Sequence, residues 1–216
     1  MEILSDFLKR RDLEPAIERS LEHYSRYFVL KDEYIILNPA LLGEPSGIAH
    51  SAFMILSLLH SRIREGDRRV RLLADGILAQ QRPDGSYKIY FGPEPDEGLE
   101  FYPGEAMLAL LETYQMTKDE KYLKSAERGF VYYKKHYYGR NRVQPDLLVF
   151  FANWQSQFCR LLYEHTRDRN IKEEVRSYLL GLHDRIIEGD FYENERMHPE
   201  RQAAVEAACA LEGLND

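Results

Sequence analysis

The stretch that decides the fold is residues 110–119, LLETYQMTKD, because its pattern returns at residues 159–168, CRLLYEHTRD. Both copies carry Tyr-x-x-Thr-(Lys/Arg)-Asp, and a weaker copy lies upstream at residues 58–67. The copies are spaced by about fifty residues, which is typical of a supersecondary unit repeated along a chain. Such a unit buries its apolar face only by stacking on its neighbours. The sequence therefore predicts a row of helical hairpins.

Helical periodicity extends from these copies over most of the chain, and helix-start and helix-end signals bound each segment. The helix before a short turn is more apolar, as in residues 106–111, than the helix after it, as in residues 121–127. An apolar helix is buried, whereas a striped helix faces water on one side. We therefore expect an all-α fold with two concentric helix layers, as in an α/α toroid. The expected helices are 15–28, 45–64, 67–78, 103–116, 120–135, 147–166, 170–187 and a last one from 199.

The loops alternate in length. The turn inside a hairpin is very short, as at Thr117-Lys118, whereas the connections at residues 82–102 and 137–146 are long and rich in Gly, Pro, Asp and Tyr. This alternation predicts tight turns on one rim of the fold and elaborated loops on the other. Functional side chains gather on long loops that a rigid scaffold holds, so we expect the site at the loop-rich mouth.

Composition excludes several classes of protein. The 216 residues favour one domain over residues 1–216. The net charge is −7 and no basic block is present, which argues against a nucleic-acid partner. The N-terminus lacks the basic and apolar regions of a secretion signal, and the apolar stretch 48–59 is too short to span a membrane. Cys159 and Cys209 favour packed thiols in a reducing compartment, with a cytoplasmic location as the expectation.

Two stretches carry a family resemblance. Residues 81–87, QRPDGSY, resemble the QW motif of triterpene cyclases and other α/α-toroid proteins, with Tyr87 in place of the usual Trp. Residues 102–111, YPGEAMLALL, followed by TKDEKYL at 117–123, resemble six-hairpin toroids such as glucuronyl C5-epimerase-like proteins and other sugar epimerases. The resemblance covers residues 45–212 and implies the toroid fold and a sugar-processing activity. It also implies that the QW-like motif packs one hairpin on the next.

The chain is short for a closed ring. Six hairpins of this length need about 300 residues, and the sequence holds about four to five hairpins. The chain is then the N-terminal part of a longer protein, or the ring is open, or a second chain completes it. An open end exposes apolar faces, so we expect self-association through that end.

Candidate site residues lie where the inner helices begin. Their N-termini direct N–H groups and a positive dipole end at the mouth, which suits anionic substrates such as uronates. Glu105 follows Pro103 in a first helical turn and is a candidate general acid or base, although it could also bind local N–H groups. The full set is His50, Tyr102, Glu105 and His198 as catalytic candidates, and Tyr87, Trp154, Gln155 and Arg201 as substrate-binding candidates.

Each candidate has a structural alternative. A histidine at a helix start either transfers protons in catalysis or is a polar surface residue next to the helix N-cap. Trp154, the only tryptophan, either stacks on a sugar ring or packs as an apolar side chain between two hairpins. The acidic run at residues 94–100 forms a lid or a solvated charged segment.

The sequence predicts neither a cofactor nor a metal site, since it lacks Cys-x-x-Cys, His-Glu-x-x-His and the phosphate-binding glycine motifs. Three functional hypotheses stay open. One is an epimerase of uronate or aminosugar units with a carbohydrate ligand. Another is a glycoside hydrolase or lyase relative. The third is a non-catalytic helical module, or partial toroid, that mediates protein–protein association. Neither the substrate nor the reaction follows from these residues.

Overall fold

The computed structural model describes residues 11–60, 66–137, 145–188 and 203–215, and most of these are helical. The elements, in chain order, are η1 (Arg11–Leu13), α2 (Glu14–Ser25), β1 (Phe28–Lys31), β2 (Tyr34–Leu37), α3 (Pro39–Leu42), α4 (Ile48–Leu59), α5 (Gly66–Ala79), α6 (Tyr102–Thr117), α7 (Glu120–His136), α8 (Pro145–His165), α9 (Arg169–Glu188) and α11 (Ala203–Asn215). The described part of the chain is thus mainly α-helical, with one small sheet.

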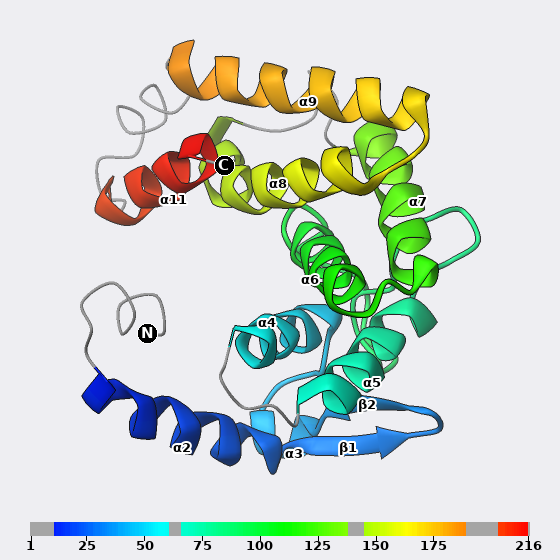
Figure 1. Cartoon of the computed structure of the whole chain (residues 1–216), viewed down its shortest axis with the longest axis vertical. Coiled ribbons are helices and arrows are strands. Elements are labelled where there is room, and N and C mark those ends of the chain that lie inside the picture. The colour runs from blue at the N-terminus through cyan, green and yellow to red at the C-terminus, as the bar shows by residue number, and fades with distance from the viewer. Residues whose placement is uncertain (1–10, 61–65, 138–144, 189–202, 216) are drawn as a thin grey trace.

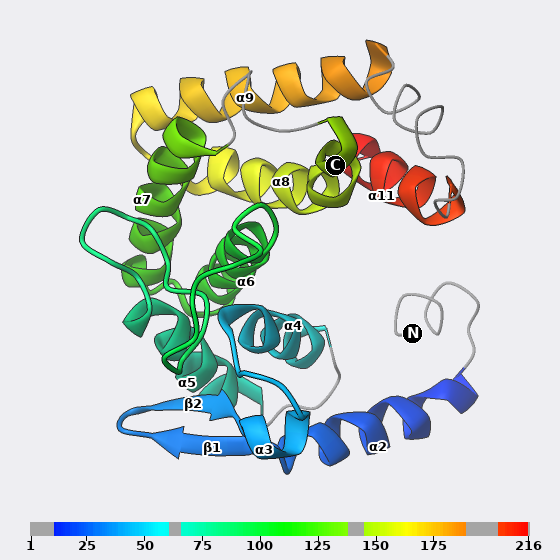
Figure 2. The ribbon, with the colours of Figure 1, turned by 180° about the vertical axis from the view of Figure 1, so that it is seen from behind.

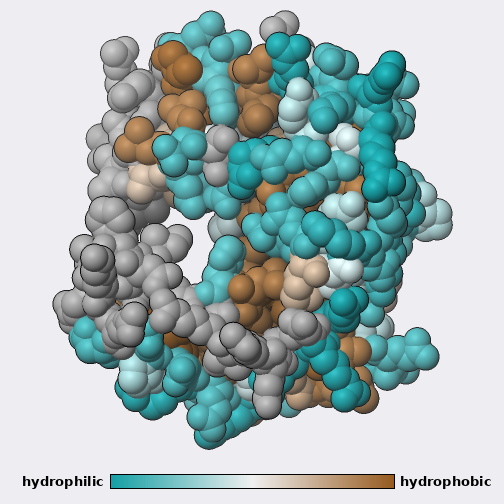
Figure 3. Space-filling view, in the orientation of Figure 1, coloured by the Kyte–Doolittle hydropathy of each residue, from teal (hydrophilic) through white to brown (hydrophobic). Residues whose placement is uncertain are grey.

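Consecutive helices pair as hairpins, because α4 packs on α5, α6 on α7 and α8 on α9. The first helices of these pairs, followed by α11, also contact one another in chain order and form the inner row of an arc (Figure 1). Among the described residues the arc is open, and α2 and α11 lie at its two ends when seen from behind as well (Figure 2). Figure 3 shows hydrophobic residues among the mainly hydrophilic surface of the described residues on this side of the molecule.

Burial separates the two rows as the sequence predicted. In α6, every residue from 103 to 111 is buried, so this inner helix is enclosed on all sides. In α7, the buried side chains follow one stripe, which includes Tyr122, Ala126, Phe130 and Tyr133, and the opposite face is exposed. The apolar member of the hairpin is therefore the inner one.

The repeated Thr-x-Asp sequence builds the same turn twice. Asp119 caps α7 through the backbone N–H of Lys121, at 3.1 Å. Asp168 caps α9 through the N–H groups of Asn170 and Ile171, at 2.8 and 3.2 Å. The threonine hydroxyl two residues before each aspartate accepts the N–H of that aspartate. Each cap satisfies N–H groups that have no partner inside their helix.

Neighbouring turns also touch, since the side chains of Gln115 and His165 are 2.9 Å apart. In addition, the Thr166 hydroxyl donates to the buried Glu127 at 2.6 Å. The residues that define the repeat therefore join one hairpin to the next.

The sheet was not expected from the sequence. The helix expected at 15–28 ends at Ser25, and Phe28 already belongs to β1, which pairs antiparallel with β2. The two-residue turn between the strands places Asp32 at φ 55°, a left-handed conformation that aspartate tolerates. Ile35 and Ile36 of β2 are buried, and β2 packs on α5. Gly76 of α5 permits this contact, because an added Cβ would lie 3.0 Å from the Ile35 carbonyl oxygen.

Candidate functional site

The site begins at the start of α4. The backbone N–H of Gly47 donates to His50 Nδ1 at 3.1 Å, so the neutral ring carries its proton on Nε2. His50 Nε2 lies 3.1 Å from Glu44 Oε1. The histidine therefore caps its own helix and points its second nitrogen at a carboxylate on the surface.

A segment of the long loop, residues 87–91, crosses the start of α4. Ile48 donates its N–H to the Ile89 carbonyl, and Phe91 donates to the Ser46 carbonyl, both at 2.9 Å. The hydroxyl of Tyr90 donates to Glu97. Because this bond stabilises the protonated phenol, and because burial does so too, the pKa of Tyr90 is raised. The crossing places a tyrosine and a carboxylate beside the first turn of α4.

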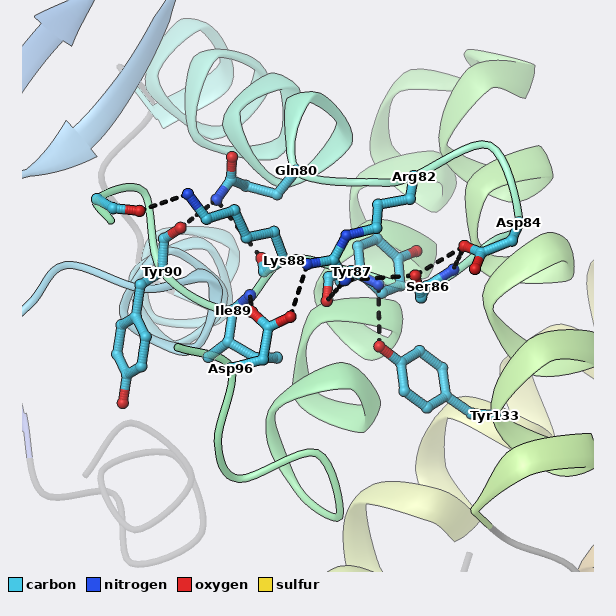
Figure 4. Close-up of polar contacts among 11 residues, drawn as sticks. Gln80, Arg82, Asp84, Ser86, Tyr87, Lys88, Ile89, Tyr90, Asp96 and Tyr133 are labelled. Carbon is cyan, nitrogen blue, oxygen red and sulfur yellow. Dashed lines mark hydrogen bonds and ion pairs between the residues drawn. The ribbon is translucent and has the colours of Figure 1, made fainter. Parts of the chain in front are cut away.

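The loop is held by its own polar side chains (Figure 4). Asp96 accepts from Arg82 at 2.6 Å and from the Ile89 N–H at 2.7 Å. Gln80 donates to the Tyr90 carbonyl at 2.5 Å. Asp96 therefore holds the loop in place. Of the acidic residues expected at 94–100, Glu94, Glu97 and Glu100 do not take part in these bonds.

Tyr87, a predicted substrate-binding residue, is fully buried, and its polar groups are bonded within the protein. Its hydroxyl lies 2.9 Å from Ser125 Oγ, and its N–H donates to the Tyr133 hydroxyl, also at 2.9 Å. The rings of Tyr87 and Tyr133 stack at an angle of 6°. Gln81, the other end of the motif, donates to the Ser125 carbonyl at 2.9 Å. The QW-like motif therefore fastens the loop to α7.

Glu105 lies in the first turn of α6 and is only 5 % exposed. Burial raises its pKa to about 7, since the charged form is poorly solvated there. Its Oε2 atom has no hydrogen-bond partner among the described residues. Near neutral pH this carboxyl is present in both protonation states, which is the condition for a group that both takes and returns a proton.

Tyr102 stands at the beginning of the same helix. Burial raises the pKa of its hydroxyl, and so do the nearby charges of Glu105, Glu97 and Glu44, in that order. The tyrosine is therefore a neutral donor with three carboxylates around it. They come from three separate parts of the chain: α6, the long loop and the segment before α4.

Trp154 and Gln155 approach this turn from α8. They were expected at the head of an inner helix, but α8 begins at Pro145, so both lie within its length. A Cβ atom added at Gly104 would lie 3.0 Å from Gln155 Nε2 and 3.5 Å from Trp154 Cβ. Gln155 is fully buried, and neither its oxygen nor its nitrogen has a partner among the described residues.

The indole of Trp154 is partly exposed and meets the ring of Phe53 edge to face, with centroids 5.5 Å apart. Phe53 is 46 % exposed. Two aromatic side chains from α4 and α8 thus share a surface next to the start of α6, although neither belongs to a loop.

Four of the predicted residues lie at the first turn of α6: Tyr102 and Glu105 belong to it, and Trp154 and Gln155 approach Gly104 from α8. His50 is connected to this turn through Glu44, which lies 3.1 Å from its Nε2 and acts electrostatically on Tyr102. His198 and Arg201 lie outside the described residues. Glu44 carried no sequence signal, and Tyr90 and Glu97 belonged to a loop whose path only the fold determines.

Other kinds of site find no support within the described residues. No three His, Cys, Asp or Glu side chains there are placed to hold a metal ion. Likewise, none of the helices in this part of the chain is long and apolar enough to cross a membrane. Comparison of the chain with protein-family models, with curated proteins and with solved structures gives no match.

Proposed function

We propose that this protein is an incomplete α/α toroid that processes a carbohydrate by proton transfer at the start of α6. The observation that carries the proposal is Glu105: a buried carboxyl with a pKa of about 7, an unpartnered oxygen and a tyrosine hydroxyl beside it. General acid–base groups work best when their pKa lies near the working pH. The buried thiol of Cys159, which forms no disulfide, supports a reducing location such as the cytoplasm.

The reaction type that fits is epimerisation at a carbon next to a carbonyl group. Glu105 as carboxylate takes the proton from that carbon, and Tyr102 donates a proton to its opposite face. Glu105 then returns its proton to the tyrosinate through solvent, so that no atom is gained or lost. The surface of Trp154 and Phe53 offers an apolar platform for the C–H face of a sugar ring.

Glu105→Gln should abolish this proton transfer while keeping the shape of the side chain. The measurement is the exchange of sugar C–H protons for deuterium in heavy water, followed by NMR over a panel of uronates, amino sugars and their N-acetyl forms. We expect the exchange rate to fall by a factor of about 10² to 10⁴. Glu112→Gln is the matched control, because Glu112 is a half-buried carboxylate of the same helix, and it should keep the wild-type rate. Equal rates in the wild type and Glu105→Gln would refute the proposal.

A second candidate function is association through the ends of the arc. Large apolar side chains are exposed on elements near both ends: Ile187 (69 %) and Leu211 (67 %) on α9 and α11, and Leu41 (51 %) on α3, which adjoins α2. Exposed apolar surface of this kind marks interaction sites. Sedimentation should show self-association that Leu211→Ser weakens, and a strictly monomeric wild type at high concentration would exclude it.

A further inference from the structure

We infer that the site at the start of α6 selects a cationic sugar, an amino sugar with a free ammonium group, over a uronate. This inference rests on the proposed function and specifies, in addition, that the substrate is positively charged. It reverses the expectation from sequence, in which the helix N-termini favoured an anion.

The first argument is the balance of charge. Glu44, Glu97 and Glu105 all lie close enough to Tyr102 to raise the pKa of its hydroxyl. No ion pair joins Glu97 or Glu105 to a basic side chain within the described residues. Three basic residues of the described chain reach the same loop: Arg82 is paired with Asp96, whereas Lys31 and Lys88 donate to the carbonyl groups of Phe91 and Gly92. Glu44 is paired with His50, so Glu97 and Glu105 are the carboxylates near Tyr102 that no basic side chain pairs with in this part of the chain.

The helix dipoles are too weak to reverse this balance. Each helix N-terminus acts as about half a positive charge, so α4 and α6 together supply about one. Glu97 and a half-ionised Glu105 supply about one and a half negative charges, even without Glu44, which is paired with His50. Two N–H groups at the start of α4 also have partners already, because Ile48 donates to the Ile89 carbonyl and Gly47 donates to His50 Nδ1. A uronate carboxylate would thus meet net repulsion, whereas an ammonium group would be attracted.

The second argument is independent of charge. Buried polar atoms without a partner are rare, and they are satisfied by protein, water or ligand. Here they lie on two neighbouring helices: Oε2 of Glu105 on α6, and both amide atoms of Gln155 on α8. Gln155 reaches the first turn of α6, as its approach to Gly104 shows.

These orphaned atoms match the chemistry of an amino sugar. The oxygens of Glu105 and Gln155 are acceptors, which suit the three N–H donors of an ammonium group. The Gln155 nitrogen is a donor, which suits a ring hydroxyl. A uronate carboxylate accepts hydrogen bonds and donates none, so only its ring hydroxyl groups could donate to these two acceptor oxygens.

The test compares three ligands of similar size by calorimetry of the full chain at neutral pH and low salt: glucosamine, N-acetylglucosamine and glucuronate. We expect glucosamine to bind at least about tenfold more tightly than N-acetylglucosamine, a difference of about 1.4 kcal/mol, and glucuronate to bind most weakly. Glu97→Gln should reduce the preference for glucosamine severalfold. Glu100→Gln is the matched control, since Glu100 is in the same loop but acts electrostatically on Tyr137, and it should keep the preference.

A second measurement does not depend on the folding of a variant. Glucosamine should lower the pKa of Glu105, followed by carbon NMR of labelled glutamate, because a nearby cation favours the carboxylate. Equal binding of glucosamine and N-acetylglucosamine, or tighter binding of glucuronate, would overturn the charge inference and leave the proposed proton transfer standing. Failure of every sugar to bind, together with equal exchange rates in the wild type and Glu105→Gln, would overturn both.

Discussion

Glu105→Gln should be more stable than the wild type by about 3 kcal/mol above pH 7, and nearly equal to it below pH 4.5. The pKa of Glu105 is raised from 4.5 in the unfolded chain to about 7 in the folded protein. Between these two values the folded state binds more protons than the unfolded state. Wild-type stability therefore falls as the pH rises through this window, whereas glutamine has no charge to bury.

The measurement is urea unfolding of both proteins at a series of pH values, with the difference between them plotted against pH. Taking the difference removes the titration of every other group that behaves alike in the two proteins. Glu112→Gln again serves as the control, and it should show no rise of this size. A difference that stays constant from acid to alkaline pH would show that burial does not hold Glu105 in its neutral form.

Gly85→Ala should destabilise the protein by about 3 kcal/mol or more, because two costs add at this position. The backbone of Gly85 has φ 97°, which an alanine adopts only with strain. The new Cβ would also lie 2.5 Å from the Arg128 carbonyl oxygen, which belongs to the backbone of α7 and has little freedom to move. The loop that carries the QW-like motif would have to shift away from α7.

Gly43→Ala separates these two costs. Gly43 has φ 77°, but nothing lies within 4 Å of an added Cβ, so only the backbone strain of about 1 kcal/mol remains. Chemical denaturation of the two variants should therefore give a clearly larger loss for Gly85→Ala. Equal losses of stability in the two variants would mean that the loop can move away from α7 without an energetic cost.

The parts of the fold that sequence predicted correctly depend on local signals. The aspartate caps and the alternation of apolar and striped helices can be read from a few adjacent residues, and the hairpins of α6 with α7 and α8 with α9 follow them. The β1–β2 hairpin was missed because no Asn-Gly or Asp-Gly turn marks it. Its strands are fixed instead by the packing of β2 on α5.

The features of the candidate site also divide into those that local sequence signals predict and those that depend on the fold. Tyr102 and Glu105 could be placed at a helix start because that start is visible in the sequence. The burial of Tyr87 was not visible, since it depends on Ser125 and Tyr133, which lie on α7 far along the chain. Glu44 and Glu97 meet near Tyr102 only because the long loop crosses the start of α4, and no local pattern encodes that path.

The position of Trp154 gives the protein a built-in optical reporter. It is the only tryptophan of the chain, and its indole borders both Phe53 and the first turn of α6. Intrinsic emission excited at the red edge, where tyrosine does not absorb, therefore comes from this one place. Ligand binding at the first turn of α6 can therefore be followed by fluorescence in the unmodified protein, without a dye or an attached label.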